Sequence, residues 1–179
     1  MRLALVSIVL LGALACSDSA GPGRGSVAFT YTGAGGGNFS ASGDAAFTAG
    51  TSWAAGFVRT GETHVGASNP RSGGLVDLAI LRLERTTPGS ESIDPACNID
   101  GSASCTGMNL YLNFNGDGDT GDFFCGMTSG TIVLTEISSS RAKGTFSGSG
   151  TCVDGTGGAS EAFSVSNGAF DVTLVAPPG

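Results

Sequence analysis

Positive charge and the side chains that commonly perform catalysis are scarce in this chain of 179 residues. Eight basic residues stand against fifteen acidic ones, with a single histidine, His64, and a single lysine, Lys143. An acidic chain of this kind lacks the basic surface that nucleic acid requires, so nucleic-acid binding is excluded. One imidazole serves a zinc site poorly, and no nucleophile motif accompanies His64 to form a catalytic triad. The composition therefore favours a protein that is not an enzyme.

An apolar run long enough to cross a membrane is also missing from the N-terminus. The run from Leu3 to Ala15 has thirteen residues, whereas a helix that spans the bilayer core needs about 20. It follows Met1 and Arg2 and ends on small residues, in the order of regions that makes up a secretory signal peptide. We therefore predict that residues 1–15 are a signal peptide.

Cys16 is the predicted site of lipid attachment. The tetrad from Ala13 to Cys16 resembles a bacterial lipobox, although Leu is commoner than Ala at its first position. Ordinary signal peptidase would cut the same bond and leave a free thiol. Four cysteines follow Cys16 and can pair among themselves, so acylation removes an otherwise odd thiol. Residues 16–26 are then a lipidated cysteine and a flexible tether.

The location expected from this reading is the bacterial cell envelope, with the membrane contacted through the lipid alone. In enterobacterial lipoprotein sorting, an Asp directly after the lipidated cysteine retains the protein in the inner membrane. The residue here is Ser17, so the outer membrane is favoured over the inner one.

Residues 27–179 are predicted to form one all-β domain. Apolar residues alternate with polar or small ones over short runs, which is typical of half-buried strands. Three such runs each place their apolar residues on one face: Val27, Phe29 and Tyr31; Trp53, Ala55 and Phe57; and Met108, Leu110, Leu112 and Phe114. The run from Leu75 to Arg85 is apolar on both faces in its centre, as in an inner strand. We expect an antiparallel meander of about nine or ten strands, folded as a sandwich or closed as a barrel, with Trp53 in the core.

The two clearest hairpin signals lie in the C-terminal third. Asn167-Gly168 separates two alternating segments and suits a type I′ turn. A second turn at Ser138-Ser139 would place Cys125 opposite Cys152. Cβ atoms of directly opposed residues lie about 4.5–5.5 Å apart, near what a disulfide tolerates. We therefore predict a Cys125–Cys152 disulfide.

The remaining two cysteines, Cys97 and Cys105, would then close a small loop between strands. Four cysteines allow three connectivities, and the opposed positions across the second hairpin favour this one. The domain is thus expected to hold two disulfides.

The same third of the chain resembles a family of small bacterial envelope lipoproteins. The residues concerned are Gly130 to Val133, Gly144 to Ser147 and Ser166 to Asp171, which match a GTFS…NGxFD signature. The likeness extends from Asn38 to Val175 and is most specific in its last third. It implies a lipobox, one all-β domain and a final pair of hairpins, and it implies no activity.

A loop rich in aspartate and glycine offers a candidate calcium site. Carboxylate and amide oxygens stand at Asn115, Asp117, Asp119 and Asp122, and calcium requires six to eight such hard ligands. The spacing excludes an EF-hand, because the expected glycine and distal glutamate positions are not met. The alternative is an acidic turn that binds nothing.

Three functions follow from these observations. The leading one is a non-catalytic binding or structural lipoprotein without a cofactor, with a protein or glycan partner that the sequence does not identify. A calcium-dependent or small-ligand or glycan-binding domain is the alternative. A hydrolase that uses paired carboxylates is the third, although no spacing among the fifteen acids singles out a pair.

Overall fold

The computed structural model describes residues 24–44, 51–97, 99, 103–114, 122–156, 158 and 160–177. This part of the chain forms one sheet of ten strands, within the predicted number. In chain order the strands are β1 (Arg24–Thr32), β2 (Gly37–Asp44), β3 (Trp53–Arg59), β4 (Glu62–Pro70), β5 (Val76–Leu83), β6 (Gly89–Ser92), β7 (Gly107–Phe114), β8 (Phe123–Ile137), β9 (Arg141–Asp154) and β10 (Glu161–Leu174). The only helical element within these ranges is a 3-10 turn at Ser72–Gly74. None of the described residues forms a helix long and apolar enough to cross a bilayer.

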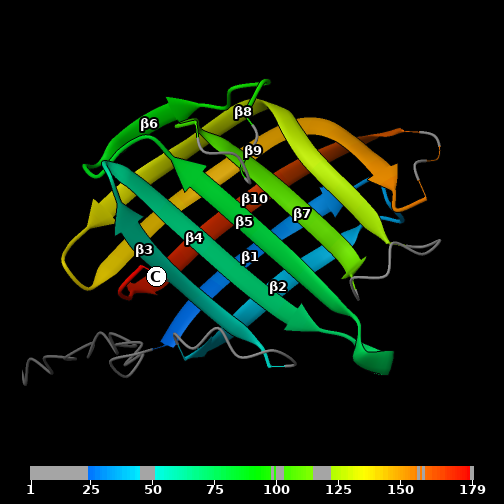
Figure 1. The fold of residues 1–179 in the computed structure, drawn as a ribbon, viewed down its shortest axis with the longest axis horizontal. Helices are drawn as coiled ribbons and strands as arrows, with labels where there is room; N and C mark the ends of the chain where they lie inside the picture. The colour runs from blue at the N-terminus through cyan, green and yellow to red at the C-terminus, as the bar shows by residue number, and fades with distance from the viewer. Residues whose placement is uncertain are drawn as a thin grey trace, which may run out of the picture.

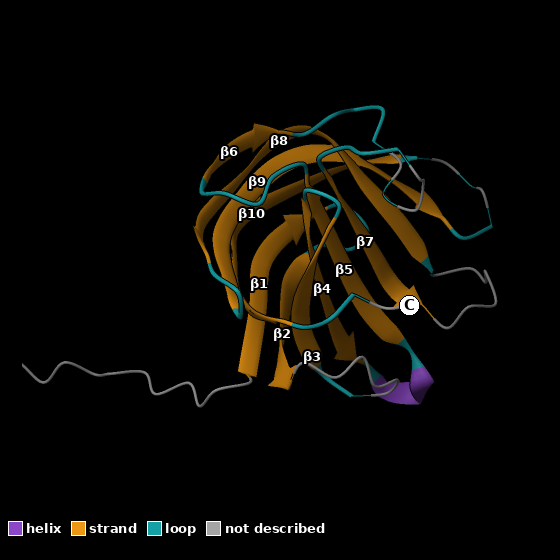
Figure 2. Cartoon of the chain, turned by 60° about the vertical axis from the view of Figure 1, so that its left-hand side comes forward, coloured by secondary structure: helices purple, strands orange, loops and turns teal. Residues whose placement is uncertain are grey.

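The sheet closes on itself through β10, so the domain is a barrel (Figure 1). One edge of β10 pairs with β9, and the other edge pairs first with β1 and then with β3. The β3 contact is short and parallel, with Thr173 opposite Ala55 and Leu174 opposite Gly56. Every other strand pair is antiparallel, as expected from the hairpin-length connections. Figure 2 shows the strands curving around a single interior.

That interior holds one continuous apolar core. Val27, Phe29 and Tyr31 of β1 point inward, as the alternation predicts, and their outward neighbours are exposed. Phe29 stacks on Phe39 with ring centroids 4.8 Å apart. Alanines on the facing strands leave room for these large rings, which explains how a barrel wall rich in small residues encloses a filled core.

The predicted inner strand is confirmed, since β5 lies between β4 and β7. Three large apolar residues, Trp53, Phe57 and Phe114, lie on the opposite face from the one expected. Trp53 lies on the outer face over Gly66, where an added Cβ would stand 3.1 Å from the indole ring, and Ala54 takes the core position on β3. A register shift at Asn113, whose φ is 54°, turns Phe114 outward against Tyr111. Alternation identifies a shared face without deciding which face is covered.

The prediction of a hairpin at Asn167-Gly168 is wrong, because β10 continues through this dipeptide. Asn167 has the expected positive φ of 53°, but it belongs to a β-bulge between Val165 and Gly168. Two neighbouring strands, β1 and β9, hold β10 on both sides here. The same local conformation therefore serves a bulge, which bends the strand around the barrel.

The β8–β9 hairpin is confirmed with a corrected register. The turn lies at Ser139-Ser140, because the backbone N–H of Ser138 donates to the carbonyl oxygen of Arg141 at 2.9 Å. Two bulges on β8, between Met127 and Ser129 and between Leu134 and Glu136, then shift the register. Their combined effect restores the predicted pairing of the two cysteines farther along the strands.

Both predicted disulfides, Cys97–Cys105 and Cys125–Cys152, are present. The Cys125–Cys152 bridge is buried in the barrel wall, and the other closes the segment between β6 and β7. β1 begins at Arg24, and Arg24 to Ser26, which the sequence assigned to the tether, pair with β2 in the sheet. Cys16 and residues 1–15, the predicted signal peptide, lie outside the described residues.

Candidate functional site

The candidate site is built on the outer face of the β3–β4 hairpin. A two-residue turn, Thr60-Gly61, has φ values of 50° and 87°, which is the pattern of a type I′ turn. This turn sets Arg59 opposite Glu62, and every second residue of β4 then points outward. Glu62 and His64 thus lie on one face. Sequence reasoning missed this hairpin, because Thr-Gly is not one of the dipeptides that usually mark a type I′ turn.

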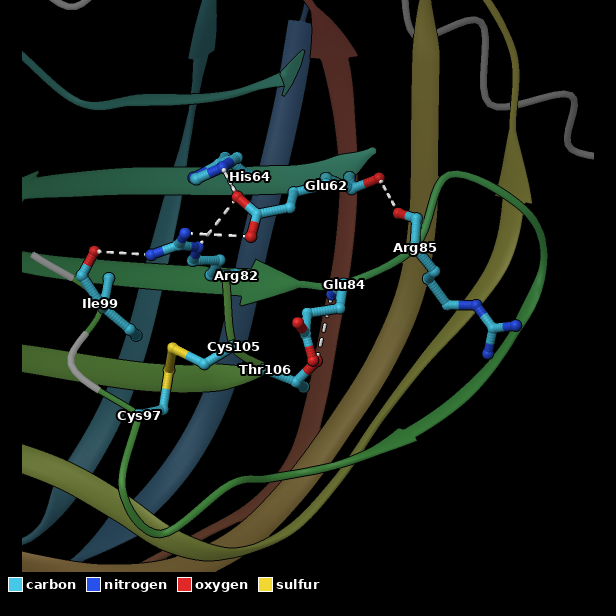
Figure 3. A network of polar contacts seen from close by, with 10 residues as sticks. Glu62, His64, Arg82, Glu84, Arg85, Cys97, Ile99, Cys105 and Thr106 are labelled. Atoms are coloured by element: carbon cyan, nitrogen blue, oxygen red, sulfur yellow. Dashed lines mark hydrogen bonds and ion pairs between the residues drawn. A yellow bond between two sulfur atoms is a disulfide. The ribbon is translucent and has the colours of Figure 1, made fainter. Parts of the chain in front are cut away.

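Arg82 joins these two residues from the neighbouring strand. It lies opposite His64 in the antiparallel β4–β5 pair. Its Nε donates to Glu62 Oε2 and its Nη2 donates to Glu62 Oε1, both at 3.0 Å. Figure 3 shows the Glu62 carboxylate held between Arg82 and His64. Such a two-point pair fixes both side chains more firmly than a single contact would.

The segment that leads into β7 covers this ion pair. Its disulfide, Cys97–Cys105, lies beside Arg82, and the Ile99 carbonyl oxygen accepts from Arg82 Nη1 at 3.5 Å (Figure 3). Thr106 fastens the same segment to the barrel, since its Oγ1 accepts from the backbone N–H of Glu84 at 3.1 Å. As a result Glu62 and Arg82 are 6% and 5% exposed, although they lie outside the barrel.

The charge states in this cluster follow from its contacts. Burial raises the pKa of Glu62, but hydrogen bonds from Arg82, Ser104 and His64 outweigh it and hold that pKa below its usual value. Burial lowers the pKa of His64 below its usual value, against the opposing effect of Glu62. At neutral pH the carboxylate is therefore ionised and the imidazole is neutral.

The His64 ring is fixed on two sides. Its Nε2 lies 3.1 Å from Glu62 Oε2. An ionised carboxylate only accepts hydrogen bonds, so Nε2 carries the proton and donates. The ring also stacks on Phe57 with centroids 4.5 Å apart and planes 9° from parallel. This packing leaves the imidazole a single orientation.

A hollow of about 430 Å³ opens above the cluster. Residues of the β3–β4 turn, the ion pair and the covering segment line it: Arg59, Thr60, Glu62, His64, Arg82, Ile99 and Ser104. Its volume is typical of small-molecule pockets, which usually have about 300–1,000 Å³. The site thus combines a preformed polar floor with room for a ligand.

The geometry of this cluster differs from that of a catalytic triad. In a catalytic triad the histidine stands between the nucleophile and the carboxylate, whereas here Glu62 contacts both His64 and Ser104. A carboxylate held by a buried guanidinium is also a weak proton acceptor. Within the described ranges no three His, Cys, Asp or Glu residues gather as a metal site would require.

Only one of the four predicted calcium ligands, Asp122, lies among the described residues. Asn115, Asp117 and Asp119 lie outside the described residues. Asp122 begins the approach to β8, is 4% exposed, and has one carboxylate oxygen, Oδ2, without a hydrogen-bond partner. The backbone N–H of Gly155 donates to its carbonyl oxygen at 2.7 Å. Calcium binding by this loop stays a prediction.

No protein-family model, curated protein or solved structure matches this chain. Function is therefore inferred from the residues of the site and from the arrangement of the cysteines.

Proposed function

We propose that this protein is an exported lipoprotein, held on the envelope by acylated Cys16, whose barrel is a non-catalytic binding module. The cysteine arrangement supports export and the anchor. The four cysteines that follow Cys16 form two disulfides. Disulfides persist in oxidising compartments. Cys16 has no partner left within the chain. Lipid attachment gives this odd residue a chemical role.

The binding role rests on the Glu62–Arg82 pair beneath the hollow. Both carboxylate oxygens of Glu62 are occupied by Arg82, and Oε2 also accepts from His64. A buried ion pair of this kind is costly to desolvate and is a weak source of stability. Its presence under a preformed hollow favours a role in shaping a ligand site, and its neutralised charges disfavour proton transfer.

The anchor is tested by replacing Cys16 with Ser and fractionating the cells. We expect the wild-type protein in the outer-membrane fraction, labelled by radioactive palmitate, and Cys16→Ser in the soluble fraction without label. Ser17→Ala is the matched control and keeps both the label and the location. Membrane retention of Cys16→Ser would contradict the lipid anchor.

A second candidate, calcium-dependent glycan binding, is favoured by Asp122. Its partnerless, buried Oδ2 is one of the predicted calcium ligands, and an unsatisfied buried carboxylate oxygen is costly unless something binds it. An aromatic cluster of Tyr111, Phe114 and Phe124 lies on the adjoining strands, with centroids 5.2 to 6.0 Å apart. Calorimetry with calcium should then show binding that Asp122→Asn abolishes. The absence of any heat at millimolar calcium would reject this candidate.

A further inference from the structure

The Arg59 guanidinium differs from the other cations of the domain. Each of the following basic residues has an acidic partner: Arg71 with Asp77, Arg82 with Glu62, Arg85 with Glu91, Arg141 with Asp171, and Lys143 with Glu136. Arg24 also has an interaction partner. Within the described part of the chain, Arg59 alone among the basic residues makes no hydrogen bond or ion pair, although it stands in an acidic protein.

This unpaired guanidinium lines the hollow above His64. Arg59 lies opposite Glu62 in the β3–β4 hairpin, but the Glu62 side chain is engaged by Arg82 on the other side. Arg59 is exposed, and no described carboxylate neutralises it. Its five N–H donors are therefore available to a ligand.

The net charge of the described residues that line the hollow suits a monoanion. The charges of Arg82 and Glu62 cancel, and Arg59 adds one positive charge. Thr60 contributes a hydroxyl group, which can donate to an anion, and Ile99 contributes an apolar wall, whereas the Ser104 hydroxyl already donates to Glu62. A phosphate dianion would need a second unpaired cation, and the described residues that line the hollow include none.

We propose that this hollow binds a small organic carboxylate, whose two oxygens pair with Arg59 and whose apolar body lies against Ile99 and His64. The planar guanidinium fork matches the two oxygens of a carboxylate. This inference rests on the proposed binding function and specifies the chemical class of its ligand. It also explains why His64 is held rigidly by Phe57 and Glu62, since a fixed ring gives a ligand a defined wall.

The single histidine makes the inference directly measurable. The imidazole resonances of the detergent-solubilised full mature protein belong to His64 alone. We expect saturable shifts of these resonances on titration with propionate or benzoate at pH 7, and weaker binding of inorganic phosphate. Arg59→Gln should weaken carboxylate binding by about tenfold or more, as expected for the loss of a charge-assisted hydrogen bond.

Two variants separate the geometry of Arg59 from its charge. Arg59→Lys keeps the charge and loses the fork, so its affinity should lie between those of the wild type and Arg59→Gln. Arg24→Gln removes an equal charge outside the hollow and should bind carboxylates as the wild type does. The melting temperature of Arg59→Gln should be unchanged, because the side chain is exposed and unpaired.

Three results would overturn the inference. They are no shift of the His64 resonances at about 100 mM carboxylate, equal binding by Arg59→Gln, or tighter binding of phosphate than of propionate. The fractionation of cells that carry Cys16→Ser tests the lipid anchor independently of ligand binding. A protein that is membrane-bound and that binds other ligands in this hollow would thus refute the carboxylate class without refuting the proposed function.

Discussion

Removing one partner of the Glu62–Arg82 pair should destabilise the domain strongly. The two side chains are 8% and 6% exposed, so Arg82→Met leaves an ionised and largely buried carboxylate whose remaining hydrogen bonds come from His64 and Ser104. Breaking a buried pair in this way costs about 3–5 kcal/mol. For a domain of this size, about 1 kcal/mol corresponds to about 2–4 °C. We therefore expect the melting temperature of Arg82→Met to fall by about 6–20 °C.

The matched control is the outer-surface pair Arg141–Asp171, whose side chains are 34% and 33% exposed. Solvent screens such a pair, so Arg141→Met should cost only about 0.2–1 kcal/mol. Urea denaturation of both variants gives the two free energies of unfolding on one scale. The difference between the two losses in free energy of unfolding measures how much the exclusion of water by the covering segment raises the cost of an unpaired charge.

A double variant completes the cycle. Glu62→Leu with Arg82→Met replaces both charges by apolar groups and should recover most of the loss, because paired replacement of buried charges is often neutral or stabilising. An Arg82→Met variant that loses no more stability than Arg141→Met would refute the reasoning. So would a double variant whose loss equals the sum of the two single losses, since the pair would then be uncoupled.

Three further perturbations test other parts of the structure. Replacing Cys125 and Cys152 together by Ala should lower the free energy of unfolding by about 3.5 kcal/mol, as expected for a bridge between residues 27 apart; unchanged urea midpoints would contradict this. Asn167→Ala should cost about 1 kcal/mol because Asn167 has a φ of 53°, whereas Asn167→Gly should cost less, so equal losses would reject strain at the bulge. The pKa of His64 lies below its ordinary 6.5 in the folded state, so the unfolded chain takes up the proton first and stability should fall as the pH drops below 6.5. His64→Gln should remove this loss of stability above pH 4.5, where the lowered pKa of Glu62 does not yet contribute. If the free energy of unfolding fell equally in the wild type and in His64→Gln, the assignment to His64 would be refuted.

Local pattern predicted the strands well because the period of two is a property of the backbone itself. It placed Val27, Phe29 and Tyr31 on one face, which the structure shows to be the core face, and it identified the strand that became β5. It failed at Asn167 because an Asn-Gly pair reports a backbone conformation, and both a turn and a bulge use that conformation. Only the presence of strands on both sides of β10 distinguishes the two.

The predicted Cys125–Cys152 disulfide is present, but the hairpin register from which it was predicted is only partly right. Cys125 and Cys152 do face each other, but the register nearest the turn differs from the expected one. Two bulges on β8 compensate for a turn displaced by one residue. The sequence carries no visible signal for these bulges, because they arise from the curvature that closes the barrel.

The candidate site could not be assembled from the sequence. Glu62 and His64 are near neighbours in the chain, yet Arg82 reaches them only through the β4–β5 pairing. Their burial depends on a segment that arrives from beyond β6. Spacing along the chain contains none of this information.

The sequence by itself determined the all-β class and the two disulfides, because alternation and cysteine number are local or countable properties, while the lipid anchor at Cys16 stays a prediction. The tertiary structure alone decided the closure through β3 and β10, the outward position of Trp53, and the burial of Glu62 beneath a disulfide-closed segment. Each of these depends on which distant strands lie side by side. That choice is made by packing around a common core, which no short stretch of sequence contains.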